Sequence, residues 1–231
     1  MTYLLSDIHG HLQRFESIME QIHLQPDDTL YILGDVIDRY PNGITILKRI
    51  MNLPNAKMLL GNHEYMMLSA IGNCKDIEEE KIKTSWKARR LWYKNKGKIT
   101  HDCLKQVQLE QRVELFNYIK SLPTNLNIEV NSIKYKLVHA SPEENYMTQY
   151  SDDYKNSQEF AVWERWNEMH PIPEGYVLIF GHTPTCYLQN EEPWSIWKGR
   201  NAIGIDCGCG YEEGRLGCLR LDDMQEFYSE D

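Results

Sequence analysis

Five short polar clusters contain most of the side chains of this chain that could carry out chemistry. Each cluster offers groups that bind divalent metals or phosphate: carboxylates, imidazoles, an amide or a guanidinium. A single Asp-x-His or Asn-His pair would mean little, because most such pairs lie in surface loops, but five clusters together favour a common site. The clusters are Asp7-Ile8-His9-Gly10, Gly34-Asp35-Val36-Ile37-Asp38-Arg39, Gly61-Asn62-His63-Glu64, His139-Ala140-Ser141-Pro142 and Gly181-His182-Thr183-Pro184.

Such a set of side chains suits the hydrolysis of a phosphate ester, a reaction with a very high uncatalysed barrier. Two metals bridged by a carboxylate lower this barrier by acidifying a bound water and by neutralising charge on the phosphoryl oxygens. Mixed carboxylate and imidazole ligands favour Mn, Fe or Zn over Ca, which prefers an all-oxygen shell. Candidate ligands in these clusters are Asp7, His9, Asp35, Asn62, His139 and His182.

Each polar cluster directly follows a short apolar run that predicts a β-strand. Ligands at the carboxyl ends of strands converge on one rim of a sheet, where α/β proteins commonly place their sites. The neighbouring glycines permit tight turns and close backbone approach. The predicted strands are residues 3–5, 30–33, 57–60, 135–138 and 177–180, and the glycines are Gly10, Gly34, Gly61 and Gly181.

The order of these clusters resembles that of the calcineurin-like metallophosphoesterases. The pair Asp38-Arg39 and the complete Gly61-Asn62-His63-Glu64 are similar to the phosphoprotein phosphatase branch, and within it to the small bacterial and bacteriophage lambda-type protein phosphatases. The resemblance runs from residue 7 to about residue 221 and is weakest between residues 74 and 131. Three further segments support it: Met66-Met67, Val162-Trp163-Glu164-Arg165 and Gly204-Ile205-Asp206-Cys207-Gly208.

The resemblance implies a dinuclear metal centre with a role for each ligand. Asp7, His9 and Asp35 would hold the first metal. Asp35 would also bridge to the second metal, and a hydroxide that bridges the two metals would attack phosphorus in line. The second metal would be completed by Asn62, His139 and His182.

The same resemblance implies a general acid and a phosphate clamp. His63 would protonate the leaving alkoxide and would be oriented by Asp38, while Arg39 and Arg165 would bind the phosphoryl oxygens. These roles also make physical sense. His63 follows the ligand Asn62, so its imidazole can reach the metals without binding them, and a carboxylate partner keeps it in one tautomer and protonated. Arginine suits a planar, two-point grip on phosphate better than lysine.

Two enzyme functions and one non-catalytic function compete. The first is a metallophosphatase, with Mn or alternatively Fe or Zn, that acts on phosphoserine or phosphothreonine in proteins or on a small phosphoester. The second is a dinucleoside polyphosphate (Ap4A-type) hydrolase, which would need a base-stacking pocket and extra cationic groups. A degenerate domain that only binds phosphorylated partners would have lost ligands, whereas here every proposed ligand, the acid and both arginines are present.

Length and composition predict one cytoplasmic domain. The 231 residues suit a single catalytic domain, residues 1–231, with ample apolar content for one core. No apolar segment is long enough to span a membrane, and the first residues have no secretion signal. The formal net charge of −9 argues against general affinity for nucleic acid. We therefore expect neither a nucleic-acid nor a membrane partner, and the oligomeric state is left open.

The six cysteines lack a Cys-x-x-Cys or zinc-finger spacing. Cys207 and Cys209 are the only close pair, and they could form a redox switch. Two reduced thiols on opposite faces of a strand end are the better interpretation. The remaining cysteines are Cys74, Cys103, Cys186 and Cys218.

The first sixty residues alternate between strand and helix patterns, which predicts βαβ units. One helix should follow the first cluster, because Leu12, Phe15, Met19 and Ile22 recur at helical spacing. A second helix is expected over residues 44–51, with Asn42 as its cap.

Residues 74–122 predict a helical insertion over one side of the catalytic rim. An apolar stripe of Leu109, Val113, Phe116 and Leu122 should face the core. The insertion could shape a substrate groove, and a solvated helical face is an equal alternative. The groove candidates are Trp86, Arg89, Arg90, Trp92 and Tyr93.

The rest of the chain is mainly β in pattern. We expect a hairpin of residues 127–130 and 134–138 around Asn131-Ser132, then strands at 177–180, 195–197, 202–206, 217–221 and 225–228. The fold class is therefore α/β (α+β), with a central β-sandwich of two mixed sheets flanked by helices, the four-layer architecture that the resemblance also implies. Asp206 is expected to make a turn hydrogen bond beside glycine, and the alternative is that it supports a metal ligand. Glu64 is expected to orient an arginine or a ligand.

Overall fold

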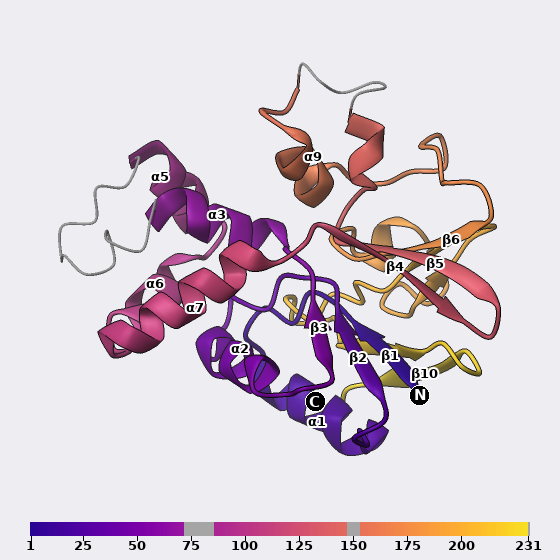
Figure 1. The fold of residues 1–231 in the computed structure, drawn as a ribbon, viewed down its shortest axis with the longest axis horizontal. Coiled ribbons are helices and arrows are strands. Elements are labelled where there is room, and N and C mark those ends of the chain that lie inside the picture. The colour runs from indigo at the N-terminus through magenta and orange to yellow at the C-terminus, as the bar shows by residue number, and fades with distance from the viewer. Residues whose placement is uncertain (72–85, 147–152, 231) are drawn as a thin grey trace.

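Two five-stranded mixed sheets form the centre of the molecule, and helices lie outside them (Figure 1). The computed structural model describes residues 1–71, 86–146 and 153–230. The first sheet has the order β10 (Gln225–Tyr228), β9 (Gly217–Arg220), β1 (Thr2–Leu5), β2 (Thr29–Ile32) and β3 (Ala56–Met58). The second has the order β4 (Asn125–Val130), β5 (Ile133–Val138), β6 (Tyr176–Phe180), β8 (Ala202–Gly204) and β7 (Trp197–Lys198).

The alternation of side chains along the strands explains why the sheets are covered on both faces. Leu4 of β1 points into the core between the sheets, where it joins Leu137 of β5 and Ile179 of β6. Its neighbours Tyr3 and Leu5 belong to the other core, between the first sheet and the helices. The predicted β-sandwich flanked by helices is therefore confirmed.

Most helices pack on the outer face of the first sheet or beside its edge (Figure 1). The first two helices are the crossover helices of the β1-α1-β2-α2-β3 unit, whose three strands are parallel. Another helix, α9, lies on the far side of the rim, at the top of Figure 1. The helices are α1 (Leu12–Ile22), α2 (Gly43–Met51), α3 (Asn62–Ile71), α5 (Trp86–Lys94), α6 (Lys98–Leu104), α7 (Leu109–Ser121) and α9 (Ser157–Trp163), with 3₁₀ turns η1 (Glu143–Asn145) and η2 (Thr185–Tyr187).

Local expectations from the sequence are mostly met. The β4–β5 hairpin turns at Asn131 and Ser132, whose φ angles of 51° and 64° are those of a tight primed turn. The helix at Gly43–Met51 also forms, but the side chain of Asn42 makes no capping hydrogen bond. The strand expected at 195–197 instead covers Trp197–Lys198.

The described part of the expected insertion, from residue 86 onward, is helical as predicted, and residues 74–85 lie outside the described residues. The expected stripe is confirmed for three of its four residues: Phe116 and Leu122 are buried in the core and Leu109 packs against it, whereas Val113 is only half-buried. In α7 the buried face also includes Leu115 and Ile119. Of the helices in the described parts of the chain, none combines the length and apolar character that a membrane span requires.

Candidate metal centre

The ends of five strands bring the six predicted ligands together in the interior. The ligands follow β1, β2, β3, β5 and β6, as the sequence predicted. All six side chains are buried, although three are carboxylates or an amide and three are imidazoles. Burying charge and polar groups at this density is costly unless something compensates them. The six ligands are Asp7, His9, Asp35, Asn62, His139 and His182.

Asp35 lies in the middle of this set, and its two carboxylate oxygens face two different groups of side chains. His9 Nε2 is 3.8 Å from Asp35 Oδ2 and also 3.8 Å from an oxygen of Asp7. On the other side, His139 Nε2 is 3.5 Å from Asp35 Oδ1 and 3.0 Å from Asn62 Oδ1. Ligand atoms that each sit about 2 Å from a shared cation are separated by such distances. The geometry thus suits a bridging carboxylate between two cations.

The hydrogen bonds of the three histidines fix which ring nitrogen is free. His9 Nδ1 lies 3.3 Å from the Ile37 carbonyl oxygen, and His139 Nδ1 lies 2.7 Å from that of Leu33. Because a carbonyl oxygen can only accept, these nitrogens donate and each Nε2 keeps a lone pair. Those lone pairs face carboxylate or amide oxygens, a repulsive arrangement unless a cation lies between them. The residues present therefore fit bound metal ions.

His182 is also oriented by a hydrogen bond to a backbone carbonyl oxygen, but through Nε2 instead of Nδ1. Its Nε2 donates to the Trp163 carbonyl oxygen at 3.1 Å, which leaves Nδ1 for the site. Burial lowers the pKa values of both His182 and His9 well below the usual range, and nearby cationic groups lower them further. Both imidazoles are thus kept neutral, the form that binds metals. Asp7 completes this side: its Oδ2 accepts from the His182 backbone N–H at 3.0 Å.

Glu64 fixes the loop that carries Asp35. One carboxylate oxygen accepts the backbone N–H groups of Asp35 and Gly61, at 2.8 and 3.2 Å. The other accepts those of Val36 and Ile37, at 2.9 and 3.2 Å. Burial raises the pKa of Glu64, and these amide donors oppose the rise. The expectation that Glu64 orients a ligand is met through the backbone; no hydrogen bond to an arginine is found in the described residues.

His63 forms a buried hydrogen-bonded group with Asp38 and Trp92. His63 Nδ1 lies 2.7 Å from Asp38 Oδ2, and Trp92 Nε1 donates to the same oxygen at 2.8 Å. Burial lowers the pKa of His63, but the charges of Asp35 and Asp38 more than offset this and raise it overall. His63 Nε2 lies 3.9 Å from Asp35 Oδ2, so the ring also faces the ligands. By distance alone His63 could join His9 and Asp35 around a cation.

The place of Trp92 corrects the expectation that it lines a substrate groove. Its side chain is 0% exposed, and it supports the partner of His63. Sequence reasoning missed this because 54 residues separate Trp92 from Asp38. Of two other groove candidates, Tyr93 is hydrogen-bonded through its hydroxyl to His101, and the charge of Arg89 helps to lower the pKa of His101. A pocket between α3, α5 and α9 lies next to the site. Of the predicted groove residues, Arg90 alone is among its described lining residues.

The two predicted clamp arginines come from distant parts of the chain, and both are electrostatic neighbours of Asp206. The Arg39 guanidinium is half-buried and lies 4.9 Å from the centre of the Tyr211 ring, which itself stacks on Trp194. Burial alone would lower the pKa of Arg39, but the adjacent Tyr211 hydroxyl and the carboxylates of Asp35 and Asp206 raise it. Arg165 is exposed, and its Nη1 donates to the His182 carbonyl oxygen at 2.7 Å. Tyr211 was not singled out from the sequence, because only the fold brings it over Arg39.

The neighbourhood of Asp206 follows the structural expectation. Its Oδ1 accepts the Gly208 backbone N–H at 3.0 Å, a turn hydrogen bond. Cys207 and Cys209 are free thiols that point into the two different cores, on opposite faces as expected.

Cys209 and Arg215 also have the Cys-x5-Arg spacing of a thiol-based phosphatase, but their geometry does not suit one. Cys209 is buried, its Sγ donates to the Ile8 carbonyl oxygen, and burial raises its pKa. A nucleophilic cysteine needs the opposite, a lowered pKa and access to substrate. The Arg215 guanidinium instead donates to the Trp194 carbonyl oxygen and to Ser195.

Known proteins resemble this chain over almost its whole length. A phosphatase of Salmonella typhimurium named serine/threonine-protein phosphatase 2 is 28% identical, with 95% of this chain and 92% of that protein covered. A protein of Wigglesworthia glossinidia brevipalpis named bis(5'-nucleosyl)-tetraphosphatase, symmetrical, is 25% identical, with 97% of each chain covered. The solved structure of a metallophosphoesterase from Sphaerobacter thermophilus has a TM-score of 0.57 at 17% identity, covering 99% of this chain and 87% of that one.

The family assignment agrees with the geometry of the strand ends. The sequence model of the family described as calcineurin-like phosphoesterase matches residues 2–211, which include every proposed ligand and both proposed clamp arginines. The fold of the solved relative is the same arrangement of two sheets and flanking helices. This chain therefore belongs to the calcineurin-like phosphoesterases, a family of metal-dependent phosphoester hydrolases.

Proposed function

We propose that this protein is a serine/threonine protein phosphatase that uses two divalent cations, preferentially Mn and alternatively Fe or Zn. The observation that carries the proposal is the position of Asp35, whose two oxygens each face a separate group of buried ligands. The relative named serine/threonine-protein phosphatase 2, which aligns over 95% of this chain, supports the choice of a phosphoprotein substrate. We also propose a cytoplasmic location, which free cysteines favour.

The chain's own residues then bind the phosphoryl group and move one proton. When bound, the two cations acidify a water molecule and neutralise charge on the phosphoryl oxygens. Arg39 and Arg165, which are both electrostatic neighbours of Asp206, hold the remaining oxygens. His63 donates the proton on Nε2 to the leaving alkoxide of serine or threonine. Asp38 accepts from Nδ1, which keeps the ring oriented and protonated.

A dinucleoside polyphosphate hydrolase is the second candidate. It is supported by the relative named as a symmetrical bis(5'-nucleosyl)-tetraphosphatase, which aligns over 97% of both chains. The same ligands, acid and arginines would serve either reaction, since both cleave a phosphorus–oxygen bond. The two functions differ in what surrounds the reacting phosphate, and therefore in the relative rates on the two substrate types.

Two measurements test the proposal. Treatment with EDTA should abolish cleavage of an aryl phosphate, and Mn should restore it; full turnover in chelator would refute a metal-dependent mechanism. Rates on phosphoserine and phosphothreonine peptides should then be compared with rates on diadenosine tetraphosphate. A kcat/KM for the nucleotide that exceeds that for every peptide by tenfold or more would replace the first candidate with the second.

A further inference from the structure

A pocket of about 620 Å³ lies between α3, α5 and α9, next to the proposed metal centre. Its wall is continuous with the site at two points. The helix α3 starts with the ligand Asn62 and contributes Tyr65 and Met66 one turn later. Trp163 of α9 lines the pocket while its carbonyl oxygen accepts the hydrogen bond of His182. A group bound in the pocket would therefore lie beside the reacting phosphate.

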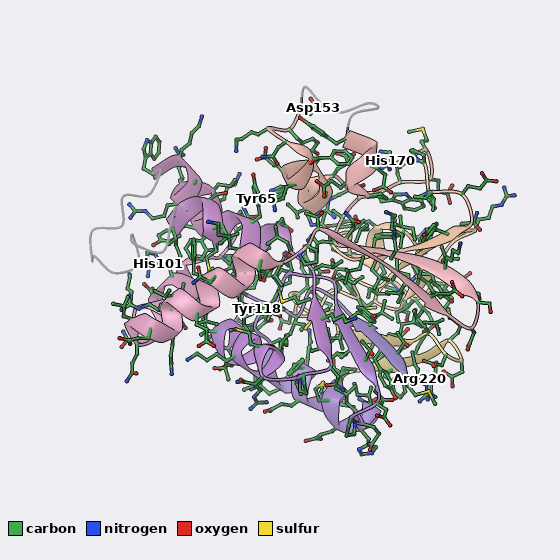
Figure 2. All side chains as sticks on the ribbon, in the orientation of Figure 1. Tyr65, His101, Tyr118, Asp153, His170 and Arg220 are labelled. Atoms are coloured by element: carbon green, nitrogen blue, oxygen red, sulfur yellow. The ribbon has the colours of Figure 1, made fainter. Side chains whose placement is uncertain are left out.

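The tyrosine of this wall ties the two helices together. Tyr65, labelled on α3 in Figure 2, interacts with the side chains of Asn156, Glu159 and Lys155 at the start of α9. Glu159 and Lys155 form an ion pair of 2.9 Å, so the one acidic side chain of the described lining is already neutralised. Among the described lining residues, the remaining charges all lie on α5.

Three cations of α5 line the pocket from one face of the helix. Lys87, Arg90 and Lys94 are spaced three, four and seven residues apart, which places them on the same side, whereas Trp92 on the other side is buried. From Lys87 to Lys94 this row extends for about 10 Å along the helix. Within the described residues none of the three forms a salt bridge. A row of unneutralised cations is notable in a chain with a net charge of −9.

The floor of the pocket is apolar. Met66 is buried, and Leu91 keeps 47% of its surface exposed although it is a large aliphatic residue. Trp163 adds a half-buried aromatic face. An apolar floor below a row of cations suits a ligand that has both an apolar side chain and several negative charges.

We propose that this pocket binds the acidic segment that flanks the phosphorylated residue of a protein substrate, with one apolar side chain on the floor. The inference rests on the proposed protein phosphatase function and adds a sequence preference to it. A row of about 10 Å matches carboxylates three residues apart on an extended peptide, at about 3.3 Å per residue.

The test compares two phosphopeptides that differ only in the flanking residues, Asp and Glu in one and Asn and Gln in the other. The wild-type protein should cleave the acidic peptide with a higher kcat/KM. Each exposed charge pair contributes a factor of roughly 1.4 to 5, so three pairs predict a preference on the order of threefold to a hundredfold. The preference should reside in KM and should fall as salt rises from about 0.05 to 0.5 M, because screening shortens the range of the interaction.

The variant Lys87→Gln, Arg90→Gln, Lys94→Gln should lose the preference, so that the two peptides give equal kcat/KM. The matched control removes three exposed cations outside the pocket, Lys120→Gln, Lys134→Gln and Arg200→Gln, and should keep it. If the pocket variant fails to fold, the salt titration of the wild-type protein still decides the question.

The outcomes separate failure of this inference from failure of the proposed function. Cleavage of both peptides at equal, salt-independent kcat/KM would overturn the pocket assignment and leave the phosphatase intact. No cleavage of either peptide, with rapid cleavage of diadenosine tetraphosphate, would overturn both. A rise of KM for diadenosine tetraphosphate in the pocket variant, with an unchanged peptide preference, would assign the pocket to nucleotide binding and overturn the peptide proposal.

Discussion

The substitution Glu64→Gln tests whether the buried carboxylate beside Asp35 holds the ligand loop in place. The wild-type side chain accepts four backbone N–H groups, two at each oxygen. An amide has the same shape but replaces one oxygen by an NH₂ group. Whichever way the amide is turned, two backbone donors then face another donor and lose their acceptor.

The expected loss of stability follows from these contacts. A hydrogen bond to a charged acceptor contributes roughly 1.5–3 kcal/mol, so two lost bonds predict that the free energy of unfolding falls by about 3–6 kcal/mol. The two surviving bonds also weaken, because their acceptor is now neutral. For a chain of this length each kcal/mol lowers Tm by roughly 2–4 °C, so Tm should fall by about 6 °C or more.

The assay is thermal and urea-induced unfolding in EDTA, so that differences in metal binding do not contribute. The matched control is Glu143→Gln. The carboxylate of Glu143 accepts from the hydroxyl groups of Thr124 and Ser157, and hydroxyl groups can rotate to accept instead of donate. The control should therefore lose about 1 kcal/mol or less. A loss for Glu64→Gln no larger than that of the control would refute the argument that the four amide donors need a charged acceptor.

Three further results are expected. His63→Asn should lower kcat by about 10²–10⁴ while the metal content measured by mass spectrometry is retained; loss of metal would make His63 a ligand instead of the acid. Trp92→Phe removes the indole donor to Asp38 and should lower kcat several-fold and shift the pH profile, whereas an unchanged profile would mean that Trp92 only fills space. In the native protein, iodoacetamide should modify Cys103 and Cys186 before the other described thiols. Equal labelling of all five in peptide mapping would contradict the burial of the other three. The protected thiols, whose pKa values burial raises, are Cys207, Cys209 and Cys218.

The convergence of the six proposed ligands could be predicted from the sequence because each follows an apolar run directly. A strand end fixes where the next few residues lie, so Asp7 after β1 and His139 after β5 had to meet at one rim. The identity of the side chains then indicated the chemistry. Placing these residues and naming their chemistry required only the pairing of strands into a sheet. No other contact between distant segments had to be known.

The residues that support the ligands could not be predicted in the same way. Trp92 reaches Asp38 from a helix in the insertion, and Tyr211 reaches Arg39 from a loop near the end of the chain. Aromatic residues at such positions have the same local pattern whether they pack in a core, line a groove or hold a catalytic group. Their function depends on tertiary packing, which periodicity does not record.

The backbone conformation of the site indicates that its amino acids are set by chemistry and not by what suits the backbone best. Six residues of the site lie in the left-handed region, where non-glycine residues are uncommon, with φ angles between 50° and 72°. Each such residue costs on the order of 1–3 kcal/mol and persists only where the surroundings hold it. Glycine would relieve this cost at every one of these positions, yet none could then bind a metal or a phosphate. The six residues are Asp7, His9, Asp35, Asp38, Arg39 and His182. Their amino acid types are those that the proposed reaction needs. Glu64 and the histidine–carbonyl hydrogen bonds anchor the loops, which lets the fold tolerate these strained conformations.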